Sequence, residues 1–339
     1  MALWEVFMNS LVKKMRKISR ILKNNLVFLI LLLFLFAFPL WIRGYWLYLF
    51  ILIIIRGLLA TGFNVIYGYT GLLHFGMSVF LGIGSYSVII AIKYLNGSFF
   101  LISLLTLSIA VVASFLLGLL IMRFKSYTFV MLTIIISTIF FTLAMSMRWL
   151  TGGDEGLAVT VPAINLLNLK LSLLNIKTSY YFTLIVVGFF IYLTKRIMGS
   201  PLGAAFKGIK HNEELMRSIG YNVNLIKLAS LTIAGFLGCI AGGLYVLVEG
   251  YASANLFFWL YSGYAAVWTI LGGAGTIIGP FIGSALLTYT ENIFSTWAPS
   301  LWLIVVGSII IIMILMFPYG VSGYIEKIII YRKNRGVIL

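Results

Sequence analysis

The sequence predicts an all-α integral membrane protein that crosses the bilayer with about ten helices, and three observations support this fold class. Of the 339 residues, 62% are hydrophobic and 9% are charged, whereas an ordinary soluble domain is roughly 45–50% apolar and about a quarter charged. Apolar runs close to the roughly 20 residues of a membrane-crossing helix follow one another along the chain. Lysine and arginine gather between those runs. This composition excludes a soluble enzyme, a nucleic-acid-binding protein and a disordered scaffold.

The chain begins with a basic segment, residues 1–25, which we expect to lie in the cytoplasm. Its basic residues are Lys13, Lys14, Arg16, Lys17, Arg20 and Lys23. An apolar run, 26–42, follows directly. The two together resemble a signal peptide, but the run is long, no A-x-A-like cleavage site ends it, and a second run begins at Tyr45. We therefore expect 26–42 to be retained as the first membrane helix.

The transmembrane domain is expected over residues 26–317. We expect helices rather than strands, because the apolar runs are far longer than the roughly 10-residue alternating segments of a membrane β-barrel. Before the main polar loop, 196–228, the expected spans are 26–42, 45–68, 72–95, 99–122, 127–149 and 179–195. After that loop they are 229–248, 251–275, 276–292 and 300–317.

Basic residues set the predicted orientation. They occur in the N-terminal segment, the turn 123–125, the loop 196–228 and the tail 318–339, so we expect these four regions and both termini to be cytoplasmic. An even number of spans must then separate any two of them. Counting 251–292 as one span would put the tail outside, so we divide it near Gly275. A re-entrant hairpin at that point is the alternative.

Charged residues inside the membrane segments are scarce. We expect Asp154, Glu155, Glu249 and Glu291 to lie in external turns, with no acidic residue mid-membrane. Proton- or sodium-coupled transporters usually need buried ionisable groups along their pathway, so this distribution speaks against them. Arg56 lies near the centre of a span. It is either a contact of the translocation pathway or an arginine that binds carbonyl groups or water.

Glycines indicate two kinds of feature. Gly238 and Gly242 form a G-x-x-x-G pattern, which lets two membrane helices approach closely. A denser series predicts a bent or broken helix that lines a cavity. This series is Gly68, Gly71, Gly76, Gly82 and Gly84. Asn64 and His74 are the candidate polar contacts beside it, although a lone histidine is more often a structural hydrogen-bond donor.

The main polar loop contains a segment that predicts one self-contained helix. Ser200 suits the N-cap, Pro201 suits the first helical position and Gly220 suits the residue past the end. Glu213 and Arg217 lie four residues apart in the order that favours an ion pair. The helix is either a docking element for a soluble partner or a helix that lies on the lipid surface, and its periodicity leaves both open.

No nucleotide or metal motif appears in the sequence. The nearest match to a P-loop is 71–78, where Met77 replaces the required lysine and no strand precedes it. The two histidines and one cysteine cannot form a local metal cluster. We therefore expect no catalytic residue, metal or cofactor, and no enzyme activity of the chain's own.

Five stretches carry a resemblance to a known family. Residues 64–86, NVIYGYTGLLHFGMSVFLGIGSY, resemble the pattern LNL..GYAGxLSLGHAAFFGIGAY of branched-chain amino acid ABC transporter permeases. The other four matches, in chain order, are 151–157, 200–220, 271–280 and 318–323. The pair Asn212–Glu213 and the TGG turn look more like the LivM-type subunit of this family than its LivH-type partner.

The resemblance implies a permease subunit of a prokaryotic plasma-membrane importer for branched-chain amino acids. Its implied partners are a second permease subunit, two cytoplasmic ATP-binding subunits that supply the energy, and an external substrate-binding protein. The loop 196–228 then carries the helix that couples to the ATPase. The residues carried over for coupling are Ser200, Pro201, Gly203, Ile209, Lys210, Asn212, Glu213 and Gly220.

Candidates for the translocation path or for helix breaks come from the glycine series and the matched motifs. They are Arg56, Asn64, Gly68, Gly71, His74, Gly76, Gly82, Gly84, Gly272, Gly273, Gly275, Gly279 and Pro280. The chain departs from the family pattern at four positions. Ala204 replaces an arginine, His211 a glutamate, Met77 a histidine and His74 a serine, which puts the exact substrate in question.

Three alternatives remain at this stage. Within the family, the substrate is urea, an amide or another amino acid. Outside it, the chain is an ion-coupled secondary transporter or channel, which would need ionisable residues along its pathway. A membrane-embedded transferase would need clustered catalytic polar groups, and the sequence offers none.

Overall fold

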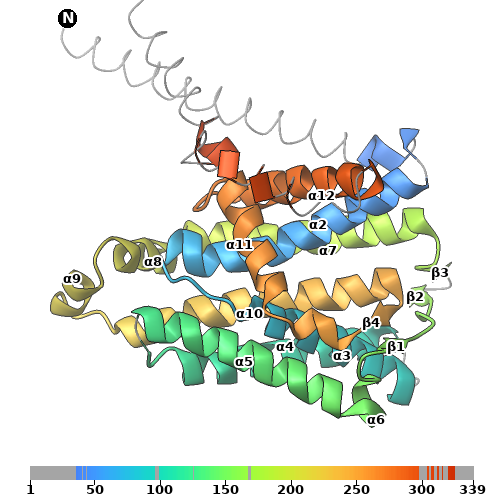
Figure 1. The fold of residues 1–339 in the computed structure, drawn as a ribbon, viewed down its shortest axis with the longest axis horizontal. Helices are drawn as coiled ribbons and strands as arrows, with labels where there is room; N and C mark the ends of the chain where they lie inside the picture. Colours follow the sequence, from blue (N-terminus) through green and yellow to red (C-terminus); the bar gives the residue numbers. More distant parts are fainter. Residues whose placement is uncertain are drawn as a thin grey trace, which may run out of the picture. The chain divides into compact units, whose positions relative to one another are not determined.

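The computed structural model assigns most of the chain to helices (Figure 1). The residues that it describes are 36–39, 41–42, 44–95, 99–124, 126–166, 169–297, 304, 307–308, 311–312, 315 and 320–324. By its contacts the chain divides into two compact units, Met1–Leu47 and Tyr48–Leu339. In the first unit, residues 36–39 are helical. Apart from the first residues of α2, every element below belongs to the second unit.

Several predicted segments lie outside the described residues, wholly or for the most part. These are the basic segment 1–25, the spans 26–42 and 300–317, and the tail 318–339. Their predicted roles, and the domain boundaries that depend on them, stay predictions.

The elements before the polar loop follow the predicted spans closely. They are α2 (Tyr45–Asn64), the π-helix η1 (Val65–Tyr69), α3 (Met77–Leu95), α4 (Phe99–Ile121), α5 (Ser126–Ser146), α6 (Arg148–Thr151) and α7 (Ile176–Met198). The second predicted span therefore ends in a π-helical turn, and the third begins at Met77 rather than at residue 72. The residues between form no helix or strand, which confirms the predicted break in the glycine-rich series.

The elements after α7 include two short helices and a broken region. They are α8 (Pro201–His211), α9 (Glu213–Ser218), α10 (Val223–Glu249), the 3-10 helix η2 (Ala254–Phe257), α11 (Leu260–Gly272) and α12 (Gly279–Trp297). The predicted continuous span 251–275 is wrong, because a strand and η2 precede a helix of 13 residues there. The chain does break between α11 and α12, on either side of Gly275, as expected.

Four short strands join loops. Strand β1 (Leu157–Ala158) pairs antiparallel with β4 (Tyr251–Ala252), and β2 (Ile164–Leu166) pairs antiparallel with β3 (Leu169–Leu171). Figure 1 places these strands at one end of the long helices and α8 and α9 at the opposite end. This separation agrees with the prediction that loop 196–228 and the turn at 151–157 face opposite sides of the membrane.

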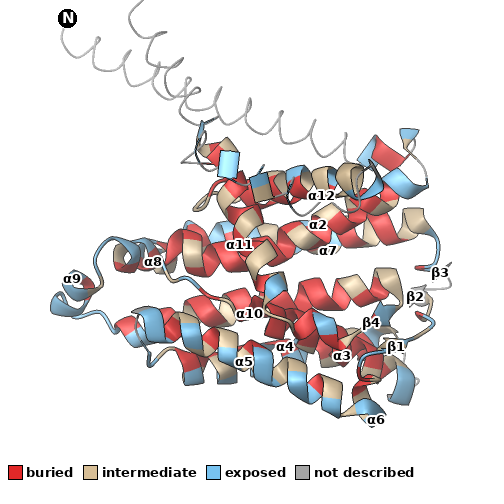
Figure 2. Ribbon diagram, viewed as in Figure 1, coloured by how far each residue is buried: buried red, intermediate tan, exposed pale blue. Residues whose placement is uncertain are grey.

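Six helices within the described residues are long and apolar enough to cross a membrane: α2 with η1, α3, α4, α5, α7 and α10. The predicted count of ten is not confirmed, because two spans lie largely outside the described residues and α11 is short. Most residues of α2, α3 and α10 are buried, whereas only about a quarter of those in α4, α5 and α7 are buried (Figure 2). An exposed apolar helix face is the surface that a lipid bilayer accepts.

The core forms where α10 packs closely against α3. A Cβ added at Gly84 would overlap the carbonyl oxygen of Cys239, and one added at Gly242 would overlap that of Leu81. The two backbones therefore touch, which is the small-residue packing of membrane helices. This confirms the packing role of Gly242 and gives Gly84 the same role.

Candidate functional site

The polar loop forms two helices instead of the one predicted. Pro201 begins α8, as expected, but Ser200 does not cap it, because its hydroxyl donates to the carbonyl oxygen of Ile197 at 2.6 Å. The chain breaks at Asn212, where φ is −158° and ψ is 105°. The Asn212 side chain then caps α9 by accepting from the Leu215 N–H at 2.9 Å. An asparagine before two glutamates is an N-cap signal that could have revealed this second helix.

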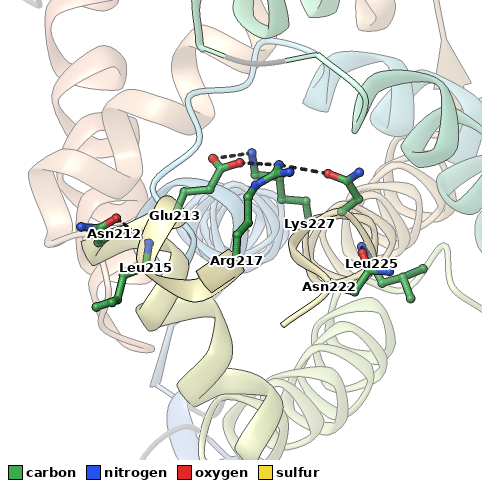
Figure 3. Close-up of polar contacts among 8 residues, drawn as sticks. Asn212, Glu213, Leu215, Arg217, Asn222, Leu225 and Lys227 are labelled. Atoms are coloured by element: carbon green, nitrogen blue, oxygen red, sulfur yellow. Dashed lines mark hydrogen bonds and ion pairs between the residues drawn. The ribbon is translucent and has the colours of Figure 1, made fainter. Parts of the chain in front are cut away.

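Glu213 joins α9 to the start of α10. Its carboxylate lies 2.9 Å from Arg217, as the four-residue spacing predicts, and 2.7 Å from the Nζ of Lys227 (Figure 3). Lys227 is 3% exposed. Partial burial raises the pKa of Glu213, but the hydrogen bonds from Lys227 and Arg217 outweigh it and hold the pKa below its ordinary value. Glu213 therefore fixes the loop internally.

Helix α8 of the polar loop rests on the end of α2. Gly203, Phe206 and Ile209 are buried along one face of α8. From its end, Lys210 donates through Nζ to the carbonyl oxygen of Gly68 at 2.7 Å. The Nζ of Lys207 lies 5.7 Å from the centre of the Tyr69 ring. Because η1 continues α2, these two lysines bind α8 to the end of a membrane helix, where a cation is favoured by the helix dipole.

The same end of α2 meets the break between α11 and α12. The buried side chain of Asn64 accepts from the Gly275 N–H at 2.7 Å and donates to the Thr276 carbonyl at 2.7 Å. A Cβ at Gly68 would lie 2.5 Å from the Gly275 nitrogen, so only glycine permits this approach. Thr276 in turn bonds Ser322 through their hydroxyls at 2.9 Å. Asn64, Gly68 and Gly275, which the sequence singled out separately, therefore form one junction.

The irregular segment after η1 is held by α5. Gly71 has a φ of +81° and contacts Lys210. The N–H of Phe75 donates to Thr133 at 3.1 Å, and its carbonyl accepts from Ser137 at 2.9 Å. These bonds satisfy the backbone of a non-helical segment, which a membrane interior requires.

His74 packs as a structural residue. It is fully buried, its Nδ1 accepts from the Gly76 N–H at 3.3 Å, and its ring lies 6.1 Å from that of Phe80 and 5.9 Å from that of Phe129. This arrangement supports the structural interpretation of the histidine.

The remaining glycine candidates shape backbone contacts. A Cβ at Gly82 would overlap the ring of Phe257, and one at Gly272 would overlap the carbonyl of Gly279. Gly273 has a φ of +116°, which favours glycine. Pro280 follows at the start of α12. These residues define the turn between α11 and α12.

Arg56 pairs with Glu291, an acidic residue whose predicted position is wrong. Its Nη1 donates to Thr288 at 2.9 Å and to Glu291 at 3.1 Å, and its guanidinium carbon lies 5.6 Å from the centre of the Trp268 ring. The expectation that Glu291 lies in an external turn is wrong, because α12 continues to Trp297. Pairing with Arg56 neutralises the carboxylate inside the helix. No local signal links two residues so far apart in sequence.

Comparison with known proteins identifies the same family that the five sequence motifs resemble. The profile of a family described as "Branched-chain amino acid transport system / permease component" matches residues 45–314. The LivM permease proteins of the high-affinity branched-chain amino acid transport systems of Salmonella typhimurium and Escherichia coli are each 24% identical in an alignment of 287 residues that covers 78% of this chain and 66% of theirs.

A probable branched-chain amino acid transport permease protein, LivH of Methanocaldococcus jannaschii, is 28% identical over 169 residues, which are 46% of this chain and 52% of its own. No solved structure matches the chain. The chain thus spans about two thirds of the length of the two LivM proteins. The matches confirm the resemblance carried by the five motifs, and with it a multi-pass protein of a prokaryotic plasma membrane. The chain belongs to the family of branched-chain amino acid transport system permease components.

Proposed function

We propose that this chain is the permease subunit of an ATP-driven importer that carries leucine, isoleucine and valine across the plasma membrane. Its partners are a second permease subunit, two cytoplasmic ATP-binding subunits and an external substrate-binding protein. The chain itself performs no catalysis and moves the substrate with energy from ATP hydrolysis in its partners. Family membership and the relatives' names support the permease role and the substrate class.

The contact between Lys210 and Gly68 carries this proposal. It connects α8, which lies beyond the ends of the membrane helices (Figure 1), to η1 at the end of α2. From there Asn64 reaches Gly275, between α11 and α12. A movement imposed on α8 is therefore passed to two membrane segments. Binding of ATP by the partner subunits would shift the population between outward-open and inward-open states by this route.

The exposed apolar residues of loop 196–228 offer a surface for the ATP-binding subunit. Leu215, Ile219, Tyr221 and Leu225 are between 52% and 60% exposed around α9 and the start of α10. A cluster of exposed apolar side chains beside polar ones is typical of a protein contact. We assign this surface and the outer face of α8 to the ATPase contact.

The opposite end supports docking of the substrate-binding protein. The loops 151–177 and 249–261 are joined there by the β1–β4 pair, in which Leu157 faces Ala252. The Tyr251 hydroxyl donates to the Glu155 carbonyl at 2.8 Å and holds the two loops together. Two distant segments thus form one surface on which a soluble protein can dock.

Uptake by the complete complex tests the proposal. The chain is co-expressed with its partners and reconstituted in liposomes. Binding protein and L-leucine are then added, and ATP is supplied on the side of the membrane where the ATP-binding subunits lie. We expect leucine accumulation only with ATP. Gly203→Trp should abolish uptake while the complex still assembles, because any side chain at Gly203 would overlap the backbone of Met198 and displace α8.

The matched control is Gly188→Trp in α7, where nothing lies within 4 Å of an added Cβ. This variant should transport normally. Accumulation of leucine by the chain alone, powered by an ion gradient, would contradict the proposal. So would normal ATP-dependent uptake by Gly203→Trp.

One observation favours the second candidate, an ion-coupled secondary transporter. The pair of Arg56 in α2 and Glu291 in α12 supplies an acidic partner for the mid-span arginine, which the sequence was expected to lack. Family membership favours the ATP-driven system. The requirement for ATP in the experiment above distinguishes the two.

A further inference from the structure

Two residues of opposite charge meet between α2 and α12. The Arg56 Nη1 lies 3.1 Å from the Glu291 Oε2, and the same nitrogen donates to the Thr288 hydroxyl at 2.9 Å. The Arg56 side chain is 33% exposed and that of Glu291 is 18% exposed. The pair is therefore partly desolvated yet still open on one side.

Stability alone does not account for this pair. Removing two charges from water costs about as much as their attraction returns, so apolar residues of similar volume would hold the helices equally well or better. Ionisable residues inside membrane segments are rare and mark substrate or ion pathways. The junction at Asn64 and Lys210, which serves coupling, does not involve either residue.

Both charged groups have hydrogen-bonding capacity left over. Within the described part of the chain, Nη1 makes both hydrogen bonds of Arg56, and the N–H groups on Nε and Nη2 have no protein acceptor. Likewise, Oε1 of Glu291 has no protein donor there. A guanidinium can hold a carboxylate through two parallel N–H groups, and a carboxylate can accept from an ammonium group.

Aromatic rings from α11 border the two charges. Arg56 lies over the ring of Trp268, which stacks on Tyr264 with centroids 6.1 Å apart and planes at 18°. Tyr261 contacts Tyr264 edge to face at 6.2 Å. Both tyrosines are close enough to interact electrostatically with Arg56 and Glu291. A Cβ added at Gly263, between these tyrosines in sequence, would meet no atom within 4 Å.

We infer that Arg56 and Glu291 form a membrane site for the zwitterionic head of an α-amino acid. Arg56 binds the carboxylate, Glu291 binds the ammonium group, and the rings of Tyr261, Tyr264 and Trp268 face the aliphatic side chain. Inserting the ligand replaces one ion pair with two, so no charge is left unpaired in the low dielectric. This inference rests on the proposed amino acid transport and adds the residues that recognise the substrate.

Analogues that lack one charge test the assignment. The full complex is placed in phospholipid nanodiscs, and binding of tritiated L-leucine is measured in competition with isocaproate, which lacks the ammonium group, and with leucinamide, which lacks the carboxylate. We expect neither analogue to compete well with leucine on the natural chain. Glu291→Gln and Arg56→Gln should each weaken leucine binding roughly ten- to hundredfold, because one charged hydrogen bond is lost.

The analogue preference separates recognition from a purely structural role. On Glu291→Gln, isocaproate should compete better relative to leucine, and on Arg56→Gln leucinamide should do so. The double variant Arg56→Glu with Glu291→Arg exchanges the two charges and should restore leucine binding. It tests recognition of the zwitterion even if a single variant fails to assemble. Unchanged leucine affinity, an unshifted analogue preference, or an assembled exchange variant that does not bind leucine would each overturn the inference.

The control variant is Thr290→Val, a half-buried position on the same helix whose hydroxyl donates to the Leu286 carbonyl. It should bind leucine as the natural chain does. If the natural complex takes up leucine with ATP and the variants keep its analogue preference, only this inference fails. If the natural complex neither binds nor transports leucine, isoleucine or valine, the proposed function fails and this inference fails with it.

Discussion

At the scale of single residues, Asn64 and Glu213 each make bonds to segments distant in sequence. Asn64 satisfies a backbone donor and a backbone acceptor at the α11–α12 break, which would otherwise be unpaired in a buried place. Glu213 binds two cations, one on its own helix and one on α10. Each side chain thus specifies a local geometry that backbone hydrogen bonding alone would not provide.

The lowered pKa of Glu213 predicts a pH dependence of the loop. A carboxyl whose folded pKa is depressed stabilises the fold above its unfolded pKa, about 4.3, and loses that contribution as pH falls through the folded value. We therefore expect residues 213–219 to be protected from hydrogen exchange at pH 7 more than in Glu213→Gln. This difference should shrink as pH falls below about 4.3 and vanish only below the folded pKa of Glu213.

The comparison is made between the two chains at each pH, so intrinsic exchange rates cancel. Glu214→Gln, at an exposed neighbouring position, is the control and should match the natural chain throughout. Equal protection of the natural chain and Glu213→Gln at pH 7 would refute the assigned role of the carboxylate.

At the scale of elements, α8 and η1 behave as a pair. Lys210 bonds the Gly68 carbonyl across 142 positions of sequence, and Gly71 leaves room for the lysine stem. Lys210→Met keeps the length and apolar stem of the side chain but removes its charge. Uptake of leucine should therefore fall about tenfold or more, the factor that corresponds to losing one charged hydrogen bond, while ATP hydrolysis by the complex continues.

His211→Gln is the matched control for this variant, since His211 is exposed on the same helix. The measurement is the ratio of leucine transported to ATP hydrolysed. An unchanged ratio in Lys210→Met would rule out the contact as the route of coupling.

Local signals predicted the element boundaries that depend on backbone chemistry. Pro201 began α8, the glycines at 68–76 ended a helix, and the glycines around 275 separated α11 from α12. One error arose where a tertiary contact decided the outcome, because Glu291 lies within α12 and pairs with Arg56 instead of ending a span. The other arose at a local cap, where Asn212 divides a helix whose composition alone favoured continuity. Neither Lys227–Glu213 nor Asn64–Gly275 leaves a pattern in the sequence.

At the scale of the whole molecule, the second unit contains a tightly packed centre and apolar outer helices. The backbones of α3 and α10 touch at Gly84 and Gly242, whereas α5 and α7 present apolar side chains outward. The composition predicted this division in general terms, since a chain with 62% hydrophobic residues must expose many of them to lipid. Which helices are central depended on the placement of glycines.

Enlarging one central glycine should destabilise the whole fold. A side chain at Gly84 would overlap the backbone of Cys239, and backbone cannot move aside as a flexible side chain can. Gly84→Val should reduce the free energy of unfolding by about 3 kcal/mol, at the upper end of overpacking effects. Thermal unfolding of the detergent-solubilised complex measures it, with Gly188→Val as the control at an open position. Equal melting temperatures for the two variants would contradict the assigned packing.

The π-helical turn at the end of α2 has a consequence for how the loop engages. Just after this turn the N–H of Gly71 bonds the Tyr67 carbonyl and that of Leu72 bonds the Ile66 carbonyl, and the next carbonyl along the chain, that of Gly68, accepts from Lys210. The last carbonyls of a helix have no N–H partner within it, so Lys210 takes a place that the backbone ladder leaves empty. Lys210 can therefore leave the Gly68 carbonyl and return to it without breaking any hydrogen bond inside the helix.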